Sequence, residues 1–291
     1  MPILIVDSSS ILFSLVLLLS PCSATAAIFG DGIAENGIED QRRISTDAEL
    51  NATGTIYCDG GLRGTATYIK ANPSQKQIPA LIVTAAHILF NQKSGEMYQT
   101  CSYLPANNRF EAIPFAAVSD YQFNPFAMDK IRQSETDFVF VALERTPRQP
   151  ALELAEAVFA GHRDQPQGLS LIGYNSKLNR ITQSNGCKVF NSNRFHSDKL
   201  LLHDCDARSG ASGGPVLAAT TNGQPEGLAK VIAIHGGTLF IHQGENSSPV
   251  GDGAAADPER WINQARRVDQ ALLQQLRQFT AYLAKDFPDQ R

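Results

Sequence analysis

Three side chains in this 291-residue sequence have the types needed for acyl transfer. Ser212 lies between glycines, His87 follows an apolar run, and Asp137 precedes another apolar run. Hydrolysis of a peptide bond needs a nucleophile, a base, a carboxylate that orients the base, and N–H donors for the oxyanion. The N–H groups of Gly210 and Ser212 are two residues apart, so both could point at one oxygen and serve as an oxyanion hole.

Each segment has a simpler reading when taken alone. A serine between glycines often marks only a turn, and a histidine after an apolar run is usually a satisfied core residue. Asp137 could be a strand cap, although an Asp at the head of so apolar a strand is expected to be half buried. A buried carboxylate requires hydrogen-bond donors, and His87 could be one of them.

Together the three segments resemble those of the chymotrypsin-like serine peptidases, which have Thr-Ala-Ala-His, Asp before an apolar strand, and Gly-x-Ser-Gly-Gly-Pro in that order. The resemblance covers roughly residues 53–245. It implies an all-β fold of two six-stranded antiparallel β-barrels with the catalytic residues in the cleft between them. It also implies a serine endopeptidase in which His87 is the general base, Asp137 orients it and Ser212 attacks, through an acyl-enzyme. Protein or peptide substrates, no cofactor and no metal are expected.

The residue before the nucleophile distinguishes branches of this family. Animal trypsin-like enzymes have an Asp there that pairs with a new N-terminal amine on activation, whereas this chain has Ala211. We therefore expect no activation by that ion pair. The pattern is closer to the bacterial glutamyl endopeptidases, which also lack this Asp and have an Ile-His-x-Gly segment, here residues 234–237.

Four residues are candidates for the substrate pocket: Asp206, Ala207, His235 and Gly236. In the glutamyl endopeptidases the equivalent of His235 helps to bind a substrate carboxylate, but Ala207 stands where that branch usually has a hydroxyl. Asp206 matches by spacing the pocket-floor Asp of trypsin, which would attract Lys or Arg. Acidic, basic, and small or apolar preferences all stay open.

The elements that must position these residues are short strands. Apolar or β-branched runs separated by Gly, Pro and Asn predict a first barrel over residues 53–150, and a second set predicts a crossover and second barrel over residues 151–245. For residues 246–291 the sequence predicts a loop and an amphipathic α-helix. Asp257 and Pro258 resemble a helix start. The expected helix would pack on the second barrel through an apolar stripe of Trp261, Ala265, Val268, Leu272, Leu276, Phe279 and Leu283.

Residues 1–27 have the form of a secretory signal peptide, although the usual basic start is missing. The apolar run from Ile11 to Leu19 is too short to cross a bilayer as a helix, so no stable membrane span is expected. We expect a secreted or periplasmic protein in which residues 28–52 form a propeptide or an N-terminal strap.

Four cysteines remain after the leader, and in an exported chain they predict two disulfides. Three pairings are possible. We expect Cys58 with Cys101 and Cys187 with Cys205, since each pair then falls within one half of the chain. The formal charge of −4, without a basic cluster, gives no basis for nucleic-acid binding.

Two other classes of function are kept as alternatives. A non-catalytic relative could use the same barrels as a binding module. The Gly-x-Ser-x-Gly pattern also occurs in α/β-hydrolase esterases, but that fold needs alternating strands and helices, and an acid and a histidine after the serine.

Overall fold

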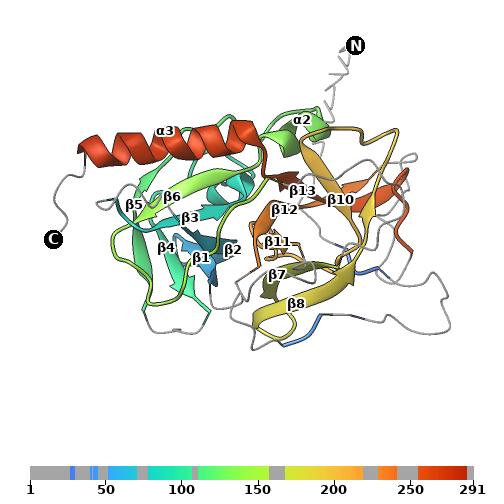
Figure 1. Ribbon diagram of the computed structural model, residues 1–291, viewed down its shortest axis with the longest axis horizontal. Coiled ribbons are helices and arrows are strands. Elements are labelled where there is room, and N and C mark those ends of the chain that lie inside the picture. The colour runs from blue at the N-terminus through green and yellow to red at the C-terminus, as the bar shows by residue number, and fades with distance from the viewer. Residues whose placement is uncertain are drawn as a thin grey trace, which may run out of the picture.

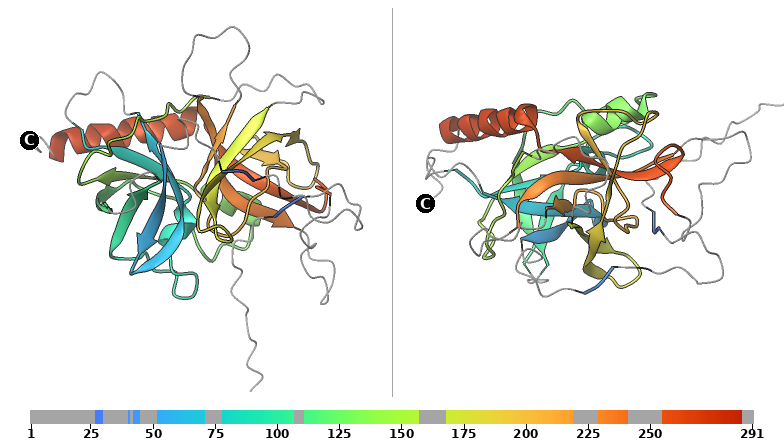
Figure 2. Two further views of the ribbon diagram at one scale, coloured as in Figure 1. Left: turned by 90° about the horizontal axis from the view of Figure 1, so that it is seen from below. Right: turned by 45° about the vertical axis from the view of Figure 1, so that its right-hand side comes forward.

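The computed structural model describes residues 27–29, 40, 42–44, 52–70, 78–106, 111–156, 168–218, 229–240 and 255–286. Two β units lie side by side, and one long helix runs along one of them (Figures 1 and 2). The expected leader lies outside the described residues apart from Ala27. Within the described residues, no helix is both long and apolar enough to cross a membrane.

The first unit is a closed antiparallel barrel of six strands in the order β1-β2-β3-β6-β5-β4. Its strands are β1 (Thr53–Cys58), β2 (Gly61–Ile69), β3 (Leu81–Thr84), β4 (Cys101–Pro105), β5 (Ile113–Val118) and β6 (Val139–Leu143). Both β3 and β6 are buried at every position. Ile82 of β3 faces the barrel interior, whereas Leu81 and Val83 belong to an apolar cluster outside it. Burial on both faces explains why these strands are continuous apolar runs.

The second unit is a seven-stranded sheet in the order β8-β7-β11-β12-β13-β10-β9. Its strands are β7 (Leu169–Asn175), β8 (Arg180–Cys187), β9 (Val189–Phe190), β10 (Leu200–His203), β11 (Pro215–Leu217), β12 (Val231–Phe240) and β13 (Trp261–Arg267). The two edge strands, β8 and β9, are consecutive in the chain and separated only by Lys188. The sheet therefore curls so that its two edges are formed by β8 and β9, which are the two halves of one bent strand. When these halves are counted as one strand, the unit has the expected six strands.

The helix expected to start at Asp257 is wrong in position. Residues Trp261–Arg267 form β13, which lies between β12 and β10, and this strand carries the second barrel beyond the expected boundary at residue 245. Asp257 instead begins a turn in which its carbonyl accepts the Trp261 N–H. Pairing with two neighbouring strands outweighs the helical spacing of the first apolar residues.

The helix α3 spans Gln270–Asp286, and the Asp269 carboxylate accepts the Leu272 N–H at its start. Its buried face consists of Leu272, Leu276, Phe279, Thr280 and Leu283. The expectation that it packs on the second barrel is wrong. These side chains share an apolar cluster with Leu81 and Val83 of β3 and Phe140 of β6, so the helix covers the first barrel, as Figure 1 shows.

Two disulfides join the expected pairs. Cys58 and Cys101 are opposite one another in the β1–β4 pairing, and their bond staples the first barrel. The bond between Cys187 and Cys205 holds the bend between β8 and β9. Lys188 at this bend receives a second restraint, because its N–H donates to the Asp204 carboxylate at 2.6 Å. Two disulfides are consistent with an extracellular or periplasmic protein.

Candidate active site

His87 is placed by the end of β3. A short 3-10 helix, η2 (Ala86–Leu89), begins two residues after the strand and turns the imidazole away from the barrel wall. Because Thr84 at the end of β3 pairs with Val139 at the start of β6, His87 lies close to the residues that precede β6. Asp137 is one of these residues, between α2 (Lys130–Glu135) and β6.

Asp137 binds His87 through both carboxylate oxygens. Its Oδ2 lies 2.7 Å from His87 Nδ1, and its Oδ1 accepts the backbone N–H of His87 at 2.8 Å. Both side chains are buried. An ionised carboxylate can only accept, so Nδ1 carries a proton, and the neutral form of this ring has its free lone pair on Nε2.

Ser212 lies in a tight turn before β11, and the glycines on either side of it have left-handed backbones. Gly210 has a φ of 97° and Gly213 a φ of 86°. A Cβ at Gly213 would lie 2.0 Å from the carbonyl oxygen of Thr65, so only glycine fits there. The turn lies directly against the end of β3, since the same Cβ would be 3.0 Å from the Ala85 nitrogen.

Most backbone N–H groups of this turn donate to a carbonyl, but two of them do not. The N–H of Ala211 donates to Arg208, that of Gly213 to His235, and that of Gly214 to Ala211. The N–H groups of Gly210 and Ser212 have no acceptor in the part of the chain that the structure describes. These are the two donors that the sequence assigned to an oxyanion hole.

The Ser212 hydroxyl donates to the carbonyl of Gly236 at 3.4 Å. Among the described residues no hydrogen bond joins it to His87. In enzymes without substrate the bond between nucleophile and base is often long or poorly aligned, and it tightens when substrate binds. His87, Asp137, Ser212 and Gly210 therefore gather where β3, β6 and the turn before β11 meet.

The description "trypsin-like peptidase domain" fits this arrangement, because a family model of that description matches residues 64–227, more than half of the chain. The chain belongs to this family. No curated protein matches the sequence. The fold also excludes the α/β-hydrolase alternative, since the named strands of both units pair antiparallel rather than in a parallel sheet.

Solved structures resemble this trypsin-like peptidase in fold. A Glu endopeptidase is 15% identical, with a TM-score of 0.58 over 87% of this chain and 99% of the other. The thermostable serine protease AL20, from an extremophilic microorganism, is 12% identical, with a TM-score of 0.53 over 81% and 99%. Mouse neuropsin, a serine protease expressed in the limbic system of the brain, is 11% identical, with a TM-score of 0.53 over 84% and 98%.

His235 and Gly236 of the peptidase lie in β12, beside the turn that contains Ser212. His235 pairs with a second buried histidine, His203 of β10, which sequence reasoning did not single out. Cys205 N–H donates to His203 Nδ1 at 3.2 Å, so His203 carries its proton on Nε2. That Nε2–H donates a hydrogen bond to His235 Nδ1, with 3.3 Å between the two nitrogens. His235 in turn must carry its proton on Nε2.

Both histidines are held neutral. Burial lowers the pKa of His203 to about 3, and burial, followed by the nearby His203 and His87, holds the pKa of His235 well below its usual value. The Gln264 carbonyl faces His235 and weakly opposes this shift. Even so, His235 Nε2 meets no acceptor with hydrogen-bond geometry among the described residues. His235 therefore directs a buried N–H donor towards the region of the Gln264 carbonyl without a well-aligned hydrogen bond to it.

Asp206 and Ala207 of the peptidase are occupied by the N-terminal segment. Phe29 N–H donates to Asp206 Oδ1 at 2.8 Å, and Ala207 N–H donates to the Ala27 carbonyl at 2.9 Å. Asn263 of β13 completes the seat, because its side chain both accepts the Ala27 N–H and donates to the Ala27 carbonyl. The candidate pocket-floor carboxylate thus already has a backbone partner.

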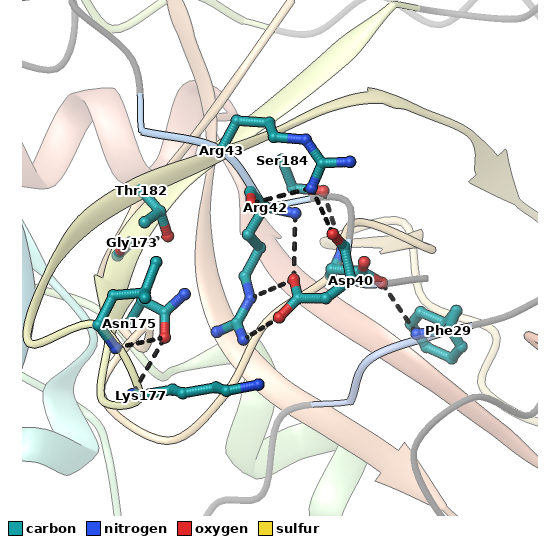
Figure 3. A network of polar contacts seen from close by, with 11 residues as sticks. Phe29, Asp40, Arg42, Arg43, Gly173, Asn175, Lys177, Thr182 and Ser184 are labelled. Carbon is teal, nitrogen blue, oxygen red and sulfur yellow. Dashed lines mark hydrogen bonds and ion pairs between the residues drawn. The ribbon is translucent and has the colours of Figure 1, made fainter. Parts of the chain in front are cut away.

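A second part of the N-terminal segment covers the edge strand β8 (Figure 3). Arg43 and Gln183 exchange two backbone hydrogen bonds of 2.8 Å. Arg42 is buried beside Asp206 and Ala211, and its guanidinium grips the Asp40 carboxylate with two bonds of 2.6 and 2.8 Å. That hydrogen-bonded guanidinium holds the pKa of Asp40 below its usual value. The segment is therefore bonded to the second barrel at two places.

Proposed function

We propose that this trypsin-like peptidase is an exported serine endopeptidase with Ser212 as nucleophile, His87 as general base and Asp137 as the group that orients the base. The observation that carries the proposal is the pair of hydrogen bonds that His87 makes with the Asp137 carboxylate. They orient the neutral imidazole with its free Nε2 next to a turn that presents a serine hydroxyl and two N–H groups without an acceptor among the described residues. The leader-like residues 1–27 support export.

The reaction follows from these atoms. His87 Nε2 takes the Ser212 proton as Oγ bonds to the substrate carbonyl carbon, and the carbonyl oxygen becomes an anion. The N–H groups of Gly210 and Ser212 stabilise that anion. The imidazolium then protonates the amine as the peptide bond breaks and the acyl-enzyme forms. Water, activated by the same histidine, attacks the acyl carbon and regenerates Ser212.

Labelling with a fluorophosphonate probe tests the assignment, because the probe phosphonylates only an activated serine. We expect the wild type to be labelled and Ser212→Ala to be unlabelled. Ser209→Ala is the matched control, since this exposed serine lies in the same loop, and it should be labelled as the wild type. A folded wild type that resists labelling and hydrolyses no peptide would favour the alternative of a non-catalytic binding module.

We further propose that the substrate side chain before the scissile bond is acidic. The relay from Cys205 through His203 makes His235 a neutral donor through Nε2, which suits a carboxylate oxygen and cannot bind an ammonium or guanidinium. The competing basic preference required a free Asp206 carboxylate. One oxygen of that carboxylate instead accepts a hydrogen bond from Phe29, and Arg42 lies beside it.

Peptides that differ only in Glu, Lys or Leu at this position test the preference. We expect the highest kcat/KM for Glu. His235→Leu, which removes the donor at similar volume, should reduce kcat/KM for the Glu peptide by roughly 10- to 100-fold and leave the Leu peptide little changed. The control His196→Ala alters an exposed histidine and should change neither value. A wild type that prefers Lys would contradict the acidic assignment and return Asp206 to the pocket.

A further inference from the structure

Thr65 lies in β2 of the first barrel, but it makes two hydrogen bonds to the turn that contains Ser212, called the nucleophile turn below, and a third to Tyr174 of β7. Its backbone N–H donates to the Ser212 carbonyl at 2.8 Å. Its hydroxyl donates to the Gly210 carbonyl at 2.6 Å and accepts the Tyr174 N–H at 2.9 Å. The residue is fully buried.

The directions of these bonds follow from the groups involved. A backbone N–H can only donate and a carbonyl can only accept. The Thr65 hydroxyl therefore accepts a hydrogen bond from the Tyr174 N–H and donates one to the Gly210 carbonyl. The Thr65 hydroxyl is thus used in both senses. It connects β2, the nucleophile turn and β7 at the place where the two barrels meet.

The carbonyl that Thr65 holds belongs to the peptide between Gly210 and Ala211. This peptide lies between the two N–H groups that we assign to the oxyanion hole. Gly210 has a left-handed backbone, and glycine is the residue whose own sterics restrict rotation least. The Gly210 N–H itself belongs to the preceding peptide, which meets the held peptide at the Gly210 Cα. Hydrogen bonds that hold the Gly210 carbonyl therefore also restrict the position of this Cα and of its N–H.

Two contacts pin that peptide. Its N–H, on Ala211, donates to the Arg208 carbonyl at 2.9 Å within the turn itself. Its oxygen is held by Thr65, from outside the turn. Packing adds a side restraint, since the Tyr174 ring lies so close to Gly210 that a Cβ there would be 2.7 Å from the ring. Of these two hydrogen bonds, the one from Thr65 connects the peptide to the first barrel.

We propose that Thr65 is a positioning residue for the oxyanion hole, acting through the Gly210 carbonyl and the Ser212 carbonyl. The inference rests on the proposed function, because it gives Thr65 a role in a reaction at Ser212. Without the hydroxyl, the Gly210 carbonyl and the Tyr174 N–H would both lose this partner. Such groups relax towards other partners, and a shift of the held peptide would move the Gly210 Cα and with it displace the Gly210 N–H from the oxyanion.

The test compares Thr65→Val, which keeps the shape and removes the hydroxyl, with Thr65→Ser, which keeps the hydroxyl. Thr67→Val is the matched control. Thr67 lies two residues on in the same strand and is equally buried, and its hydroxyl has no hydrogen-bond partner among the described residues. Thr65→Ala removes the same hydroxyl with less bulk and serves if the valine variant fails to fold.

We expect Thr65→Val to lower kcat by roughly 100- to 1,000-fold, the loss typical of one oxyanion donor, with KM changed less than about threefold. Thr65→Ser should recover kcat to within about tenfold of the wild type, and Thr67→Val should match the wild type. A peptide boronic acid, which forms a tetrahedral adduct on the nucleophile, should lose affinity for Thr65→Val in parallel with kcat.

Two results would overturn the role of Thr65. One is a folded Thr65→Val enzyme with unchanged kcat, and the other is a Thr65→Ser enzyme that loses as much kcat as Thr65→Val. Failure of the proposed function looks different, because a wild type without turnover or probe labelling would already fail before any Thr65 variant is compared. Thermal unfolding of each variant separates a loss of folded protein from a loss of kcat.

Discussion

His87→Ala is expected to lower kcat by roughly 10⁶-fold, and Ser212→Ala by a similar factor. The double variant should lose no more than either single variant, because the base has no function without the hydroxyl that it deprotonates. Residual hydrolysis would come from substrate binding and the oxyanion N–H groups, which neither change removes. Steady-state hydrolysis of a peptide substrate by the full chain, corrected for folded protein, measures all three values.

The exposed His196 again gives the control for this experiment, since His196→Ala should keep wild-type kcat. Two outcomes would contradict the assignment. A His87→Ala enzyme within about 100-fold of wild type would mean that another group is the base. Losses that multiply in the double variant would mean that the two side chains act in separate steps.

Asp137→Asn is expected to lower kcat by about 10⁴-fold with little change in KM. The reason lies in the two bonds to His87. The backbone N–H of His87 needs an acceptor, so the Asn oxygen would face it and the Asn NH₂ group would face Nδ1. The ring would then accept at Nδ1 and carry its proton on Nε2, which is the wrong tautomer for a base.

Asp129→Asn is the matched control. Asp129 caps α2 by accepting the Arg132 N–H, and asparagine is an equally good cap, so kcat and stability should both be kept. The rate of fluorophosphonate labelling should fall with kcat in Asp137→Asn and stay at the wild-type value in the control. Equal labelling rates for Asp137→Asn and the wild type would show that Asp137 does not orient the base.

The sequence predicted the parts of the site that lie in continuous local patterns. The apolar runs of β3 and β6 are visible because both strands are buried on two faces, and they place His87 and Asp137 at adjoining ends. Glycines around Ser212 are visible because the left-handed backbone requires them. These signals depend on neighbours in the chain and need no knowledge of tertiary contacts.

Other parts depend on distant residues and left little or no local signal. Thr65 is a β-branched residue in a strand, and nothing nearby indicates that its hydroxyl reaches Gly210. In the sequence, His203 is only a histidine at the end of a short apolar strand. It meets His235 because β10 and β12 both pair with β13. The helix start was misplaced for the same reason, because pairing of Trp261–Arg267 on both sides overrides a helical spacing.

The seat of the N-terminal segment has a consequence for how the chain reaches its final state. Ala27 bonds to Asn263, a separation of 236 residues, whereas the disulfide of the first barrel spans 43. The first barrel can close while later residues are still being synthesised. Contacts between such distant residues form slowly. Docking of the N-terminal segment on Asp206 and Asn263 must therefore be among the last steps of folding, after nearly the whole chain has emerged.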